Sequence, residues 1–439
     1  TGTFAGNGST VDPYIIDSLV DLQAINKNAT TRGYNYQLGT DLDASTTRSW
    51  NDGKGFVPVG AVDGMDSDQP FSGSLDGDGH TISNLVVDQR STDTLGLVGE
   101  LGSSGTIDNV SLQNASINGN NQIGAIAGVS AGEITNVSVT GTVTGNNQIG
   151  GAVGEGNSGG TVTDTTAAVS VDGNSQIGGL IGDFKGGTIA NSTARGAVES
   201  SSGGYVGGLI GYYDDKSGAD SVIKDVSATG DVVGSGRYVG GLIGQSRTTS
   251  NGDITITDAH AEGNVTEASG QSNNEVGGLI GEITSAGDIT DVSATGAVRA
   301  NGSEVGGLVG RLDHERNGYR NRNHPYSLKN ASATGTVTTD GKYVGGLVGR
   351  HRYAKAVTNA SATGDVATDG NQAGGLIGKL RGGAVRDAAA RGDAERGSHG
   401  YVDGLVGYYS DRNSRVYPRL RNVSAAGTVS GEADQVVIL

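Results

Sequence analysis

The sequence predicts an all-β protein, an elongated β-solenoid (β-helix) of about 11–12 coils that follows an N-terminal cap section containing a short helix. Three observations predict this fold. Glycine makes up 79 of the 439 residues, whereas hydrophobic residues reach 34% and aromatic residues 5%, too few for a thick globular core. A glycine-rich hexamer recurs along the chain, and a strand-like motif lies between its copies. Such a period is typical of solenoids, propellers and arrays.

The first 90 residues differ from the remainder and are predicted to form the cap. Ser18 and Asp21 have the spacing of a helix N-terminal capping box, with an acid in place of the usual Glu or Gln. Leu19, Leu22 and Ile25 then fall on one helix face. A short helix here covers the first coil, as terminal repeats require. The predicted boundaries are 1–90 for the cap and 91–439 for the repeats.

The hexamer recurs eleven times and sets the length of one coil. A typical copy is Ile177-Gly-Gly-Leu-Ile-Gly182. The steps between closing glycines are 29, 26, 28, 29, 33, 37, 29, 39, 29 and 29 residues, so the base period is about 29 with three insertions. Twenty-nine residues fit one coil of about three short strands better than a four-stranded propeller blade of about 40 residues.

The hexamer itself poses a problem of side-chain direction. Val206 and Leu209 are three residues apart, so strict strand alternation cannot bury both. The pair Gly207-Gly208 between them either bends the chain or lets another backbone approach closely. The sequence leaves both alternatives open.

The second motif is a half-buried strand with a polar corner. In Ile289-Thr-Asp-Val-Ser-Ala-Thr-Gly-Ala-Val298, the residues Val292, Ala294 and Val298 alternate as such a strand requires. The third position is Asn or Asp in every copy. Stacked coils would place these side chains about 4.8 Å apart, where amides can hydrogen-bond along the column, and both residue types suit a turn corner. The column comprises Asn109, Asn136, Asp164, Asn191, Asp225, Asp258, Asp291, Asn330, Asn359, Asp387 and Asn422.

The C-terminal residues begin to repeat the approach to a twelfth hexamer. After Val429 the chain runs to Leu439 without completing the motif or adding a polar cap. Either the sequence ends at a fragment boundary, or an open coil meets another subunit. For the second case the candidate assembly residues are Val436, Val437, Ile438 and Leu439.

The repeated hexamer resembles the GLUG motif, named for Gly-Leu-hydrophobic-Gly. Gly208–Gly211, Gly241–Gly244 and Gly346–Gly349 match it directly, whereas Gly124–Gly128 has Ala in place of Leu. The resemblance covers nearly the whole chain and implies a secreted or cell-surface, adhesin-like protein. Such repeats also occur as non-catalytic regions of some bacterial immunoglobulin A proteases. The zinc-protease signature His-Glu-x-x-His is absent from this sequence, so that activity is not inferred and the chain is predicted not to be an enzyme.

Charge excludes some partners and indicates an environment. The net charge is −17, with −16 in residues 1–220 and −1 in residues 221–439. The first half should repel nucleic acid and anionic membranes, and no run is long enough for direct membrane insertion. An acidic chain with 9 lysines against 21 arginines resembles halophilic proteins, and an ordinary acidic secreted protein is the alternative.

Eleven Asn-x-Ser/Thr sequons permit glycosylation of a secreted chain. Stacking of the Asn/Asp column explains most of them equally well. The candidate glycosylation sites are Asn7, Asn28, Asn114, Asn136, Asn191, Asn330, Asn359 and Asn422.

A candidate binding edge comes from residues that follow the closing glycines. Because they share a position in the repeat, stacking should gather them along one side, and exposed Tyr and Arg dominate contact surfaces. The edge would bind a glycan, an anionic ligand or another protein, including a second copy; alternatively, these are solvated loops that offset the acidic body. Its residues are Tyr212, Tyr213, Arg311, His314, Arg316, Tyr319, Arg322, Tyr326, Arg350, His351, Arg352, Tyr353, Arg381, Tyr408, Tyr409, Arg412, Arg415 and Tyr417.

No cofactor is predicted. The alternative is a Ca²⁺ site with carboxylate oxygen ligands, although the acidic residues concerned lack the spacing of a calcium loop. These residues are Asp63, Asp66, Asp68, Asp76 and Asp78. The function predicted is an extracellular structural or adhesive protein, a rigid stalk or fibre with a contact edge. One alternative is a subunit of a filament that polymerises head to tail. The other is a carbohydrate-active β-helix enzyme, which would need paired carboxylates; no such pair stands out.

Overall fold

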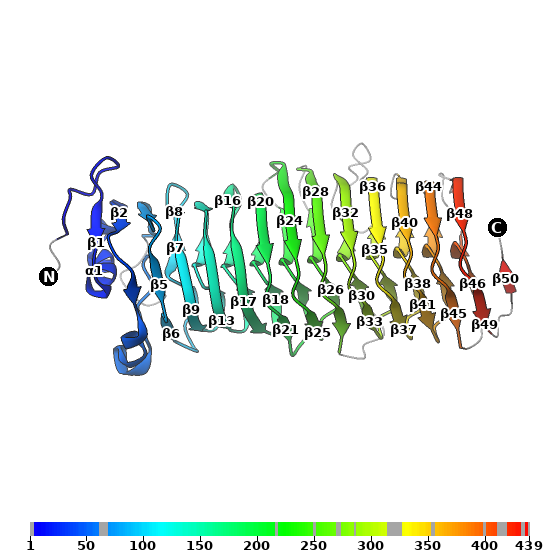
Figure 1. The fold of residues 1–439 in the computed structure, drawn as a ribbon, viewed down its shortest axis with the longest axis horizontal. Coiled ribbons are helices and arrows are strands. Elements are labelled where there is room, and N and C mark those ends of the chain that lie inside the picture. Colours follow the sequence, from blue (N-terminus) through cyan, green and yellow to red (C-terminus); the bar gives the residue numbers. More distant parts are fainter. Residues whose placement is uncertain are drawn as a thin grey trace.

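The computed structural model is a straight rod of stacked coils (Figure 1). It describes residues 4–60, 69–215, 218–248, 252–268, 274–284, 287–313, 327–352, 356–397, 401–410, 419–431 and 435–437. Their strands form one sheet of 28 strands and two of 11 strands. The predicted β-solenoid, of about eleven coils, is confirmed.

The two narrow sheets contain the strands on either side of the hexamer glycines. The first narrow sheet consists of β10 (Asn121–Gly124), β14 (Asn147–Gly150), β18 (Ser175–Gly178), β22 (Tyr205–Gly207), β26 (Tyr238–Gly240), β30 (Glu275–Gly277), β34 (Glu304–Gly306), β38 (Tyr343–Gly345), β42 (Gln372–Gly374), β46 (Tyr401–Asp403) and β50 (Gln435–Val437). The second consists of β7 (Val98–Leu101), β11 (Ala127–Ser130), β15 (Val153–Gly156), β19 (Ile181–Phe184), β23 (Ile210–Asp215), β27 (Ile243–Thr248), β31 (Ile280–Ile283), β35 (Val309–Asp313), β39 (Val348–Arg352), β43 (Ile377–Arg381) and β47 (Val406–Tyr409).

The large sheet contains the Asn/Asp motif and runs into the N-terminal section. Its strands are β1 (Tyr14–Ile16), β2 (Asn35–Leu38), β3 (Leu42–Asp43), β4 (Ser74–Asp76), β5 (Thr81–Ser83), β6 (Val86–Asp88), β8 (Thr106–Asp108), β9 (Ser111–Asn118), β12 (Glu133–Thr135), β13 (Ser138–Thr144), β16 (Gly160–Thr163), β17 (Thr166–Gly173), β20 (Gly187–Ala194), β21 (Val198–Ser200), β24 (Ser221–Ala228), β25 (Val232–Gly234), β28 (Ile254–Ala261), β29 (Val265–Glu267), β32 (Asp288–Ala294), β33 (Val298–Ala300), β36 (Ser327–Ala333), β37 (Val337–Thr339), β40 (Ala356–Ala362), β41 (Val366–Thr368), β44 (Ala384–Ala390), β45 (Ala394–Arg396), β48 (Arg419–Ala425) and β49 (Val429–Gly431).

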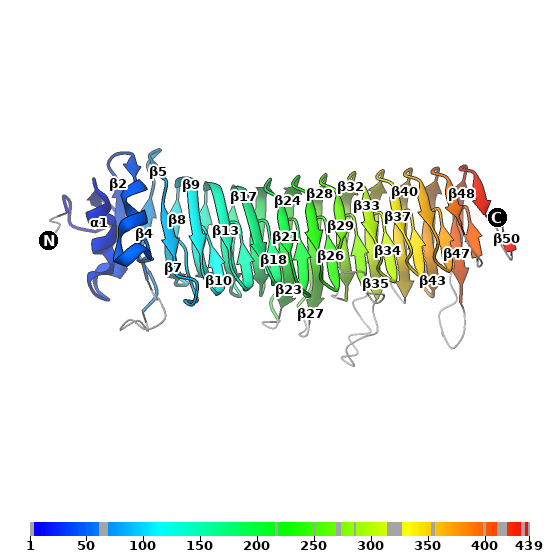
Figure 2. The same cartoon turned by 90° about the horizontal axis from the view of Figure 1, so that it is seen from below.

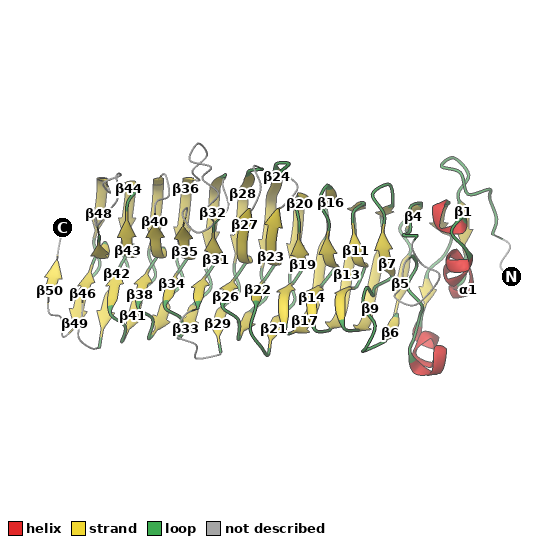
Figure 3. Cartoon of the chain, turned by 180° about the vertical axis from the view of Figure 1, so that it is seen from behind, coloured by secondary structure: helices red, strands yellow, loops and turns green. Residues whose placement is uncertain are grey.

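The helical part of the described chain lies at the N-terminal end of the rod (Figure 3). The helix α1 (Leu19–Ala24) is followed by four 3-10 helices, η1 (Ile25–Lys27), η2 (Thr31–Gly33), η3 (Ser45–Ser49) and η4 (Asn51–Gly53). Ser18 Oγ accepts a hydrogen bond from the backbone N–H of Asp21 at 3.2 Å, which confirms that Ser18 caps the N-terminus of this helix. Leu22 and Ile25 are fully buried. No helix of the described residues is long and apolar enough to cross a membrane.

One coil shows how a lean sequence builds a core. In the coil of β22, β23, β24 and β25, the side chains of Val206, Leu209, Ile210, Ile223 and Val232 are fully buried. Val206, Ile210, Ile223 and Val232 each lie in register with an aliphatic residue of the next coil, and the backbone N–H of Leu209 donates to the carbonyl oxygen of Leu242 there. A few apolar residues per coil therefore suffice, because the coils above and below complete the enclosure.

The hexamer glycines bend the chain and also let two backbones meet. Val206 and Leu209 are both buried, so strand alternation is broken between them. A Cβ on Gly207 would lie 2.0 Å from the carbonyl oxygen of Ile210 and 2.8 Å from the backbone nitrogen of Gly244 in the next coil. Both alternatives left open by the sequence are therefore correct, and a side chain at Gly207 would collide with neighbouring backbone. In the C-terminal coil of β46, Asp403 stands at the equivalent position.

The Asn/Asp column forms a corner in the large sheet, as predicted. Its eleven residues have φ between 49° and 57°, the left-handed region that Asn and Asp tolerate best after glycine. At this corner Ile223 and Val226 can both point into the core around Asp225. Side-chain amides link successive coils: Asn359 Nδ2 donates to Asn330 Oδ1, and Asn330 Nδ2 to Asp291 Oδ1, both at 2.8 Å.

Candidate functional site

The predicted binding edge is only partly an exposed surface. Tyr212, Tyr213, Arg311 and His351 are 9%, 0%, 6% and 0% exposed, so their assignment to solvent-facing loops was wrong. The reason is that β23, β35 and β39 continue past the closing glycines, and these residues belong to strands. Nine predicted residues lie outside the described part of the chain: His314, Arg316, Tyr319, Arg322, Tyr326, Tyr353, Arg412, Arg415 and Tyr417.

Two of the buried residues belong to the core itself. His351 is in register with Leu312 on one side and Leu380 on the other. Burial among these groups lowers the pKa of His351 to about 4, so the ring is neutral at pH 7. Tyr213 packs against Phe184, with ring centroids 5.7 Å apart. Both are therefore structural residues and cannot contact a ligand.

Of the remaining edge residues, Arg350 and Tyr408 stand in line with polar side chains that sequence analysis missed. Arg352 is in register with Arg381, and Tyr409, which is 46% exposed, is in register with Leu380. One column of the missed polar side chains lies on the first narrow sheet and the other on the second, whose strands β23, β27, β35 and β43 follow one another along one side of the rod (Figure 2). We call the two columns together the polar seam. The first comprises Gln122, Gln148, Gln176, Tyr205, Tyr238, Glu275, Glu304, Tyr343, Gln372 and Tyr401; the second comprises Glu155, Asp183, Tyr212, Gln245, Glu282, Arg311, Arg350, Lys379 and Tyr408.

Side chains of the seam interlock in a zigzag between coils. Gln148 Nε2 donates to Glu155 Oε2 of its own coil at 2.6 Å and to Asp183 Oδ2 of the next coil at 3.2 Å. Further along, the rings of Tyr205 and Tyr212 lie 4.3 Å apart. Burial raises the pKa of Asp183 to about 6, despite the hydrogen bond from Gln148.

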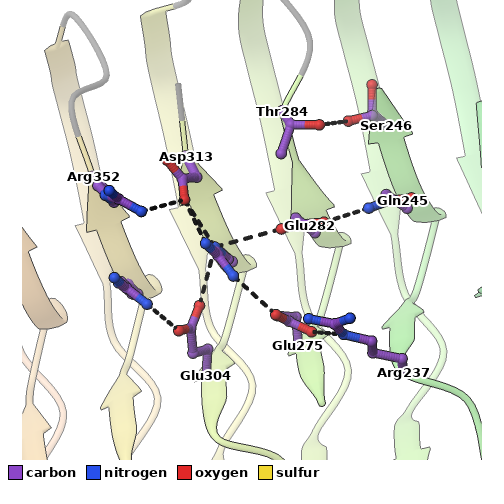
Figure 4. Close-up of polar contacts among 11 residues, drawn as sticks. Arg237, Gln245, Ser246, Glu275, Glu282, Thr284, Glu304, Asp313 and Arg352 are labelled. Atoms are coloured by element: carbon purple, nitrogen blue, oxygen red, sulfur yellow. Dashed lines mark hydrogen bonds and ion pairs between the residues drawn. The ribbon is translucent and has the colours of Figure 1, made fainter. Parts of the chain in front are cut away.

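The centre of the seam is an ion-pair network around Arg311 (Figure 4). Its Nη1 lies 3.1 Å from Glu275 Oε1, its Nε lies 3.4 Å from Glu282 Oε1 and 3.5 Å from Glu304 Oε2, and its Nη2 lies 2.5 Å from Asp313 Oδ2. These four carboxylates come from two successive coils, that of β30 and β31 and that of β34 and β35, and are nearly inaccessible. Arg311 therefore ties the coils together through charges that lack full hydration.

Three further arginines balance the carboxylates of this network. Arg237 Nε lies 3.3 Å from Glu275 Oε2, Arg350 Nη1 lies 2.6 Å from Glu304 Oε1, and Arg352 Nη1 lies 3.5 Å from Asp313 Oδ2. Burial, together with the neighbouring charge of Glu282, raises the pKa of Glu275 to about 7.

A shallow cleft of about 470 Å³ opens over this network. No group of three or more His, Asp or Glu in the described residues has the arrangement of a metal site. The acidic residues Asp63, Asp66 and Asp68 of the possible calcium site lie outside the described part of the chain. The cleft is lined by Gly203, Gly204, Ser235, Arg237, Asn274, Glu275, Ser303, Glu304 and Arg311.

The C-terminal part of the seam is aromatic and basic. Lys379 Nζ lies 4.4 Å from the ring centroid of Tyr343 and 5.0 Å from that of Tyr408. Lys342 Nζ lies 5.3 Å and the guanidinium carbon of Arg350 5.8 Å from the ring centroid of Tyr343. All four distances between a cation and a ring centroid are within the range of cation–π attraction. This region is more accessible than the centre: Lys379 and Tyr343 are partly exposed.

The candidate glycosylation asparagines fall into two groups, all exposed. Asn7 and Asn28 use their side-chain oxygen to accept backbone hydrogen bonds from Ser9 and Thr31. In the other six, the amide nitrogen that would carry a glycan donates to the neighbouring coil at 2.7–3.2 Å; these are Asn114, Asn136, Asn191, Asn330, Asn359 and Asn422.

The candidate assembly residues are described in part. Val436 and Val437 belong to β50, in register with Val402 and Asp403 of β46. Ile438 and Leu439 lie outside the described residues. Whether this end joins a second copy stays a prediction.

The geometry defines a class, a parallel β-solenoid whose repeats are closed by glycines. The GLUG motif family matches residues 202–233, 272–299 and 340–367. A stretch of 156 residues is 73% identical to halomucin of Haloquadratum walsbyi, covering 35% of this chain and 2% of halomucin. These matches support the predicted resemblance to GLUG-repeat domains of surface proteins, and the relative from a halophile supports the predicted halophilic character.

Two other similarities are more distant. A Gly-rich protein of Evansella cellulosilytica, described as a candidate membrane protein, is 30% identical over 137 residues, or 30% of this chain and 15% of that protein. A crystal structure of a candidate immunoglobulin A1 protease from Bacteroides ovatus aligns with a TM-score of 0.47 at 26% identity, covering 58% of this chain and 77% of that one. The chain thus spans a small fraction of the length of both curated relatives.

Proposed function

We propose that this chain is a rigid, non-enzymatic segment of an extracellular surface protein, a spacer that also offers a contact face. The observation that carries this proposal is the parallel pairing of strands from coil to coil, whose register shifts at a bulge between β9 and β13, around a continuous hydrophobic core. Such a stack resists bending because each coil is hydrogen-bonded along its length to both neighbours. The similarity to halomucin, a far longer protein, favours a role as one segment of a surface chain.

A non-catalytic role is supported by how the buried carboxylates are used. Glu275, Glu304 and Asp313 each pair with two arginines. These pairings give the three carboxylates a role in holding neighbouring coils together, whereas hydrolysis of a glycosidic bond needs an acid and a base that both face that bond.

Surface location is tested by antibodies raised against the purified chain. We expect them to label intact cells of the source organism, or its growth medium, without permeabilisation. Labelling that requires permeabilised cells would contradict the proposal. In parallel, incubation with a panel of polysaccharides and with immunoglobulin A1 should release no fragments, and cleavage by the wild type but not by heat-denatured protein would show an enzyme instead.

A further inference from the structure

We propose that the basic section of the polar seam, formed by Tyr343, Arg350, Lys379 and Tyr408 together with the adjacent Lys342, binds an acidic polysaccharide. This inference deepens the proposed contact function and rests on it, because it names the class of ligand and the place where it binds. It differs from the edge predicted from sequence, which included only Arg350 and Tyr408 of these five residues: Tyr343 lies in β38 of the first narrow sheet, and Lys342 directly precedes that strand.

The first argument is an excess of positive charge. Three cations, Lys342, Arg350 and Lys379, gather around the ring of Tyr343. Arg350 is paired with Glu304, but neither lysine has a carboxylate within 4.0 Å in the part of the chain that is described. Lys379 Nζ instead donates to the hydroxyl of Tyr343 at 3.0 Å. Positive charges that lie close together repel one another, and a bound anion relieves this repulsion while accepting charge-assisted hydrogen bonds.

The second argument is the contrast with the rest of the seam. Near the N-terminal end, Lys185 is paired with Glu155. In the centre, Arg311 contacts four carboxylates. The basic section is the region where the described seam leaves lysines without an acid, in a chain whose net charge is −17. An anionic ligand would therefore be attracted to this section and repelled by the acidic surface elsewhere.

The third argument concerns the shape of the ligand. The seam repeats in steps of about 4.8 Å, the distance between hydrogen-bonded strands, so it suits an extended chain with regularly spaced groups. The rings of Tyr343 and Tyr408 lie beside Lys379, and Tyr401, which is 40% exposed, adds a ring whose centroid is 6.0 Å from that of Tyr408. Rings of this kind bury apolar surface while their hydroxyl groups keep polar contacts. A polymer of sugars that carry carboxylates or sulfates satisfies both requirements.

An acidic peptide fits less well. A peptide that adds a strand needs an unpaired sheet edge. In the basic section, β38, β39, β42 and β43 each have parallel partners on both sides. A peptide would be limited to side-chain contacts, whereas a polysaccharide needs no backbone edge.

The test measures binding of fluorescent alginate oligosaccharides, a polyuronate, by anisotropy between 0.5 and 3 M NaCl, with circular dichroism on each sample as the check of folding. The double variant Lys342→Gln/Lys379→Gln should weaken binding about tenfold. The matched control is Lys224→Gln/Lys329→Gln, which removes the same charge from two exposed lysines of the large sheet that pair with Asp225 and Asp288. This control should bind alginate within about twofold of the wild type.

Three outcomes would overturn the inference. Equal weakening by both double variants would mean diffuse attraction to lysine charge rather than a site. Tighter binding of poly-glutamate than of alginate and of dextran sulfate would make the ligand a peptide. Absence of binding at every salt concentration, in samples with native circular dichroism, would remove the site, while cell-surface labelling by the antibody would still support the proposed function.

Discussion

The Asn/Asp corner and each of the two columns of the polar seam run along the rod with one residue per coil. They differ in which residue types occupy that position. The corner repeats a single solution, a left-handed residue whose amide or carboxylate meets its neighbour. Each column of the seam carries several residue types along the rod, among them amides, tyrosines, acids and, in the second column, cations. A uniform column stabilises the stack, whereas a column that varies gives each coil its own chemistry.

The sharpest way to break the seam is to remove its central cation. Arg311→Met leaves Glu275, Glu282, Glu304 and Asp313 buried without their shared partner. We expect a loss of about 3–5 kcal/mol in the free energy of unfolding, measured by urea denaturation in molar salt. The exposed Arg299→Met in β33 is the control and should change stability by less than about 0.5 kcal/mol. Comparable losses in the two variants would mean that the network contributes nothing specific.

The glycines beside the seam test how closely the narrow sheets must approach. Gly207→Ala places a methyl group 2.0 Å from a carbonyl oxygen and should cost roughly 3 kcal/mol. In the same coil, Gly203 has no atom within 4 Å of such a methyl group. Gly203→Ala should therefore be neutral or stabilising by a few tenths of a kcal/mol. Thermal unfolding of the two variants compares these effects. Equal melting temperatures for Gly207→Ala and Gly203→Ala would contradict the close backbone approach at Gly207.

The pH dependence of stability separates the seam from the corner. Because the folded pKa of Glu275, about 7, exceeds its ordinary value of 4.5, the stability linked to its proton is complete below pH 4.5 and is lost as the pH rises through 7. Glu275→Gln should remove about 1–2 kcal/mol of the difference in unfolding free energy between pH 5 and pH 8.

His351 acts in the opposite direction, because its folded pKa of about 4 lies below the ordinary 6.5. The stability that neutral His351 contributes is lost as the pH falls from 6.5 through 4. Because the wild type and Glu275→Gln both contain His351, this effect cancels when the two proteins are compared. An unchanged pH dependence in Glu275→Gln would show that Glu275 is ionised in the folded chain.

The smallest effect is expected at the corner. Asn359→Ala loses the 2.8 Å bond to Asn330 and must hold alanine at φ 51°, which should cost about 1–2 kcal/mol. Asn359→Gly loses the same bond without that backbone strain, and should be less destabilising than the alanine variant. Thermal melting of the two variants separates the cost of the lost hydrogen bond from the cost of backbone strain. An alanine variant more stable than the glycine variant would contradict the left-handed conformation at this corner.

Most of the fold, but little of the site, could be predicted from the sequence. The period of the hexamer, the alternation in Ile289–Val298 and the pair Ser18 and Asp21 each report on contacts that recur or are local. Tyr213 and His351 were predicted to be exposed because the polar segments that contain them resemble loops. In the structure, β23 and β39 continue past the closing glycines and bury both side chains. A signal was present at the positions that flank each hexamer, where Glu275, Glu304 and Lys379 stand in register with tyrosines and amides of other coils.

The sequence by itself determined the coil length, the core columns and the Asn/Asp corner, because every coil imposes the same local requirement and repetition makes that requirement visible. Only the tertiary structure decided which charges meet. Arg311 lies 36 residues from Glu275, and Lys379 lies 36 residues from Tyr343. These pairs depend on insertions that shift sequence spacing but leave the register of the coils unchanged. Electrostatic energy follows distance in space, and that distance is set by stacking.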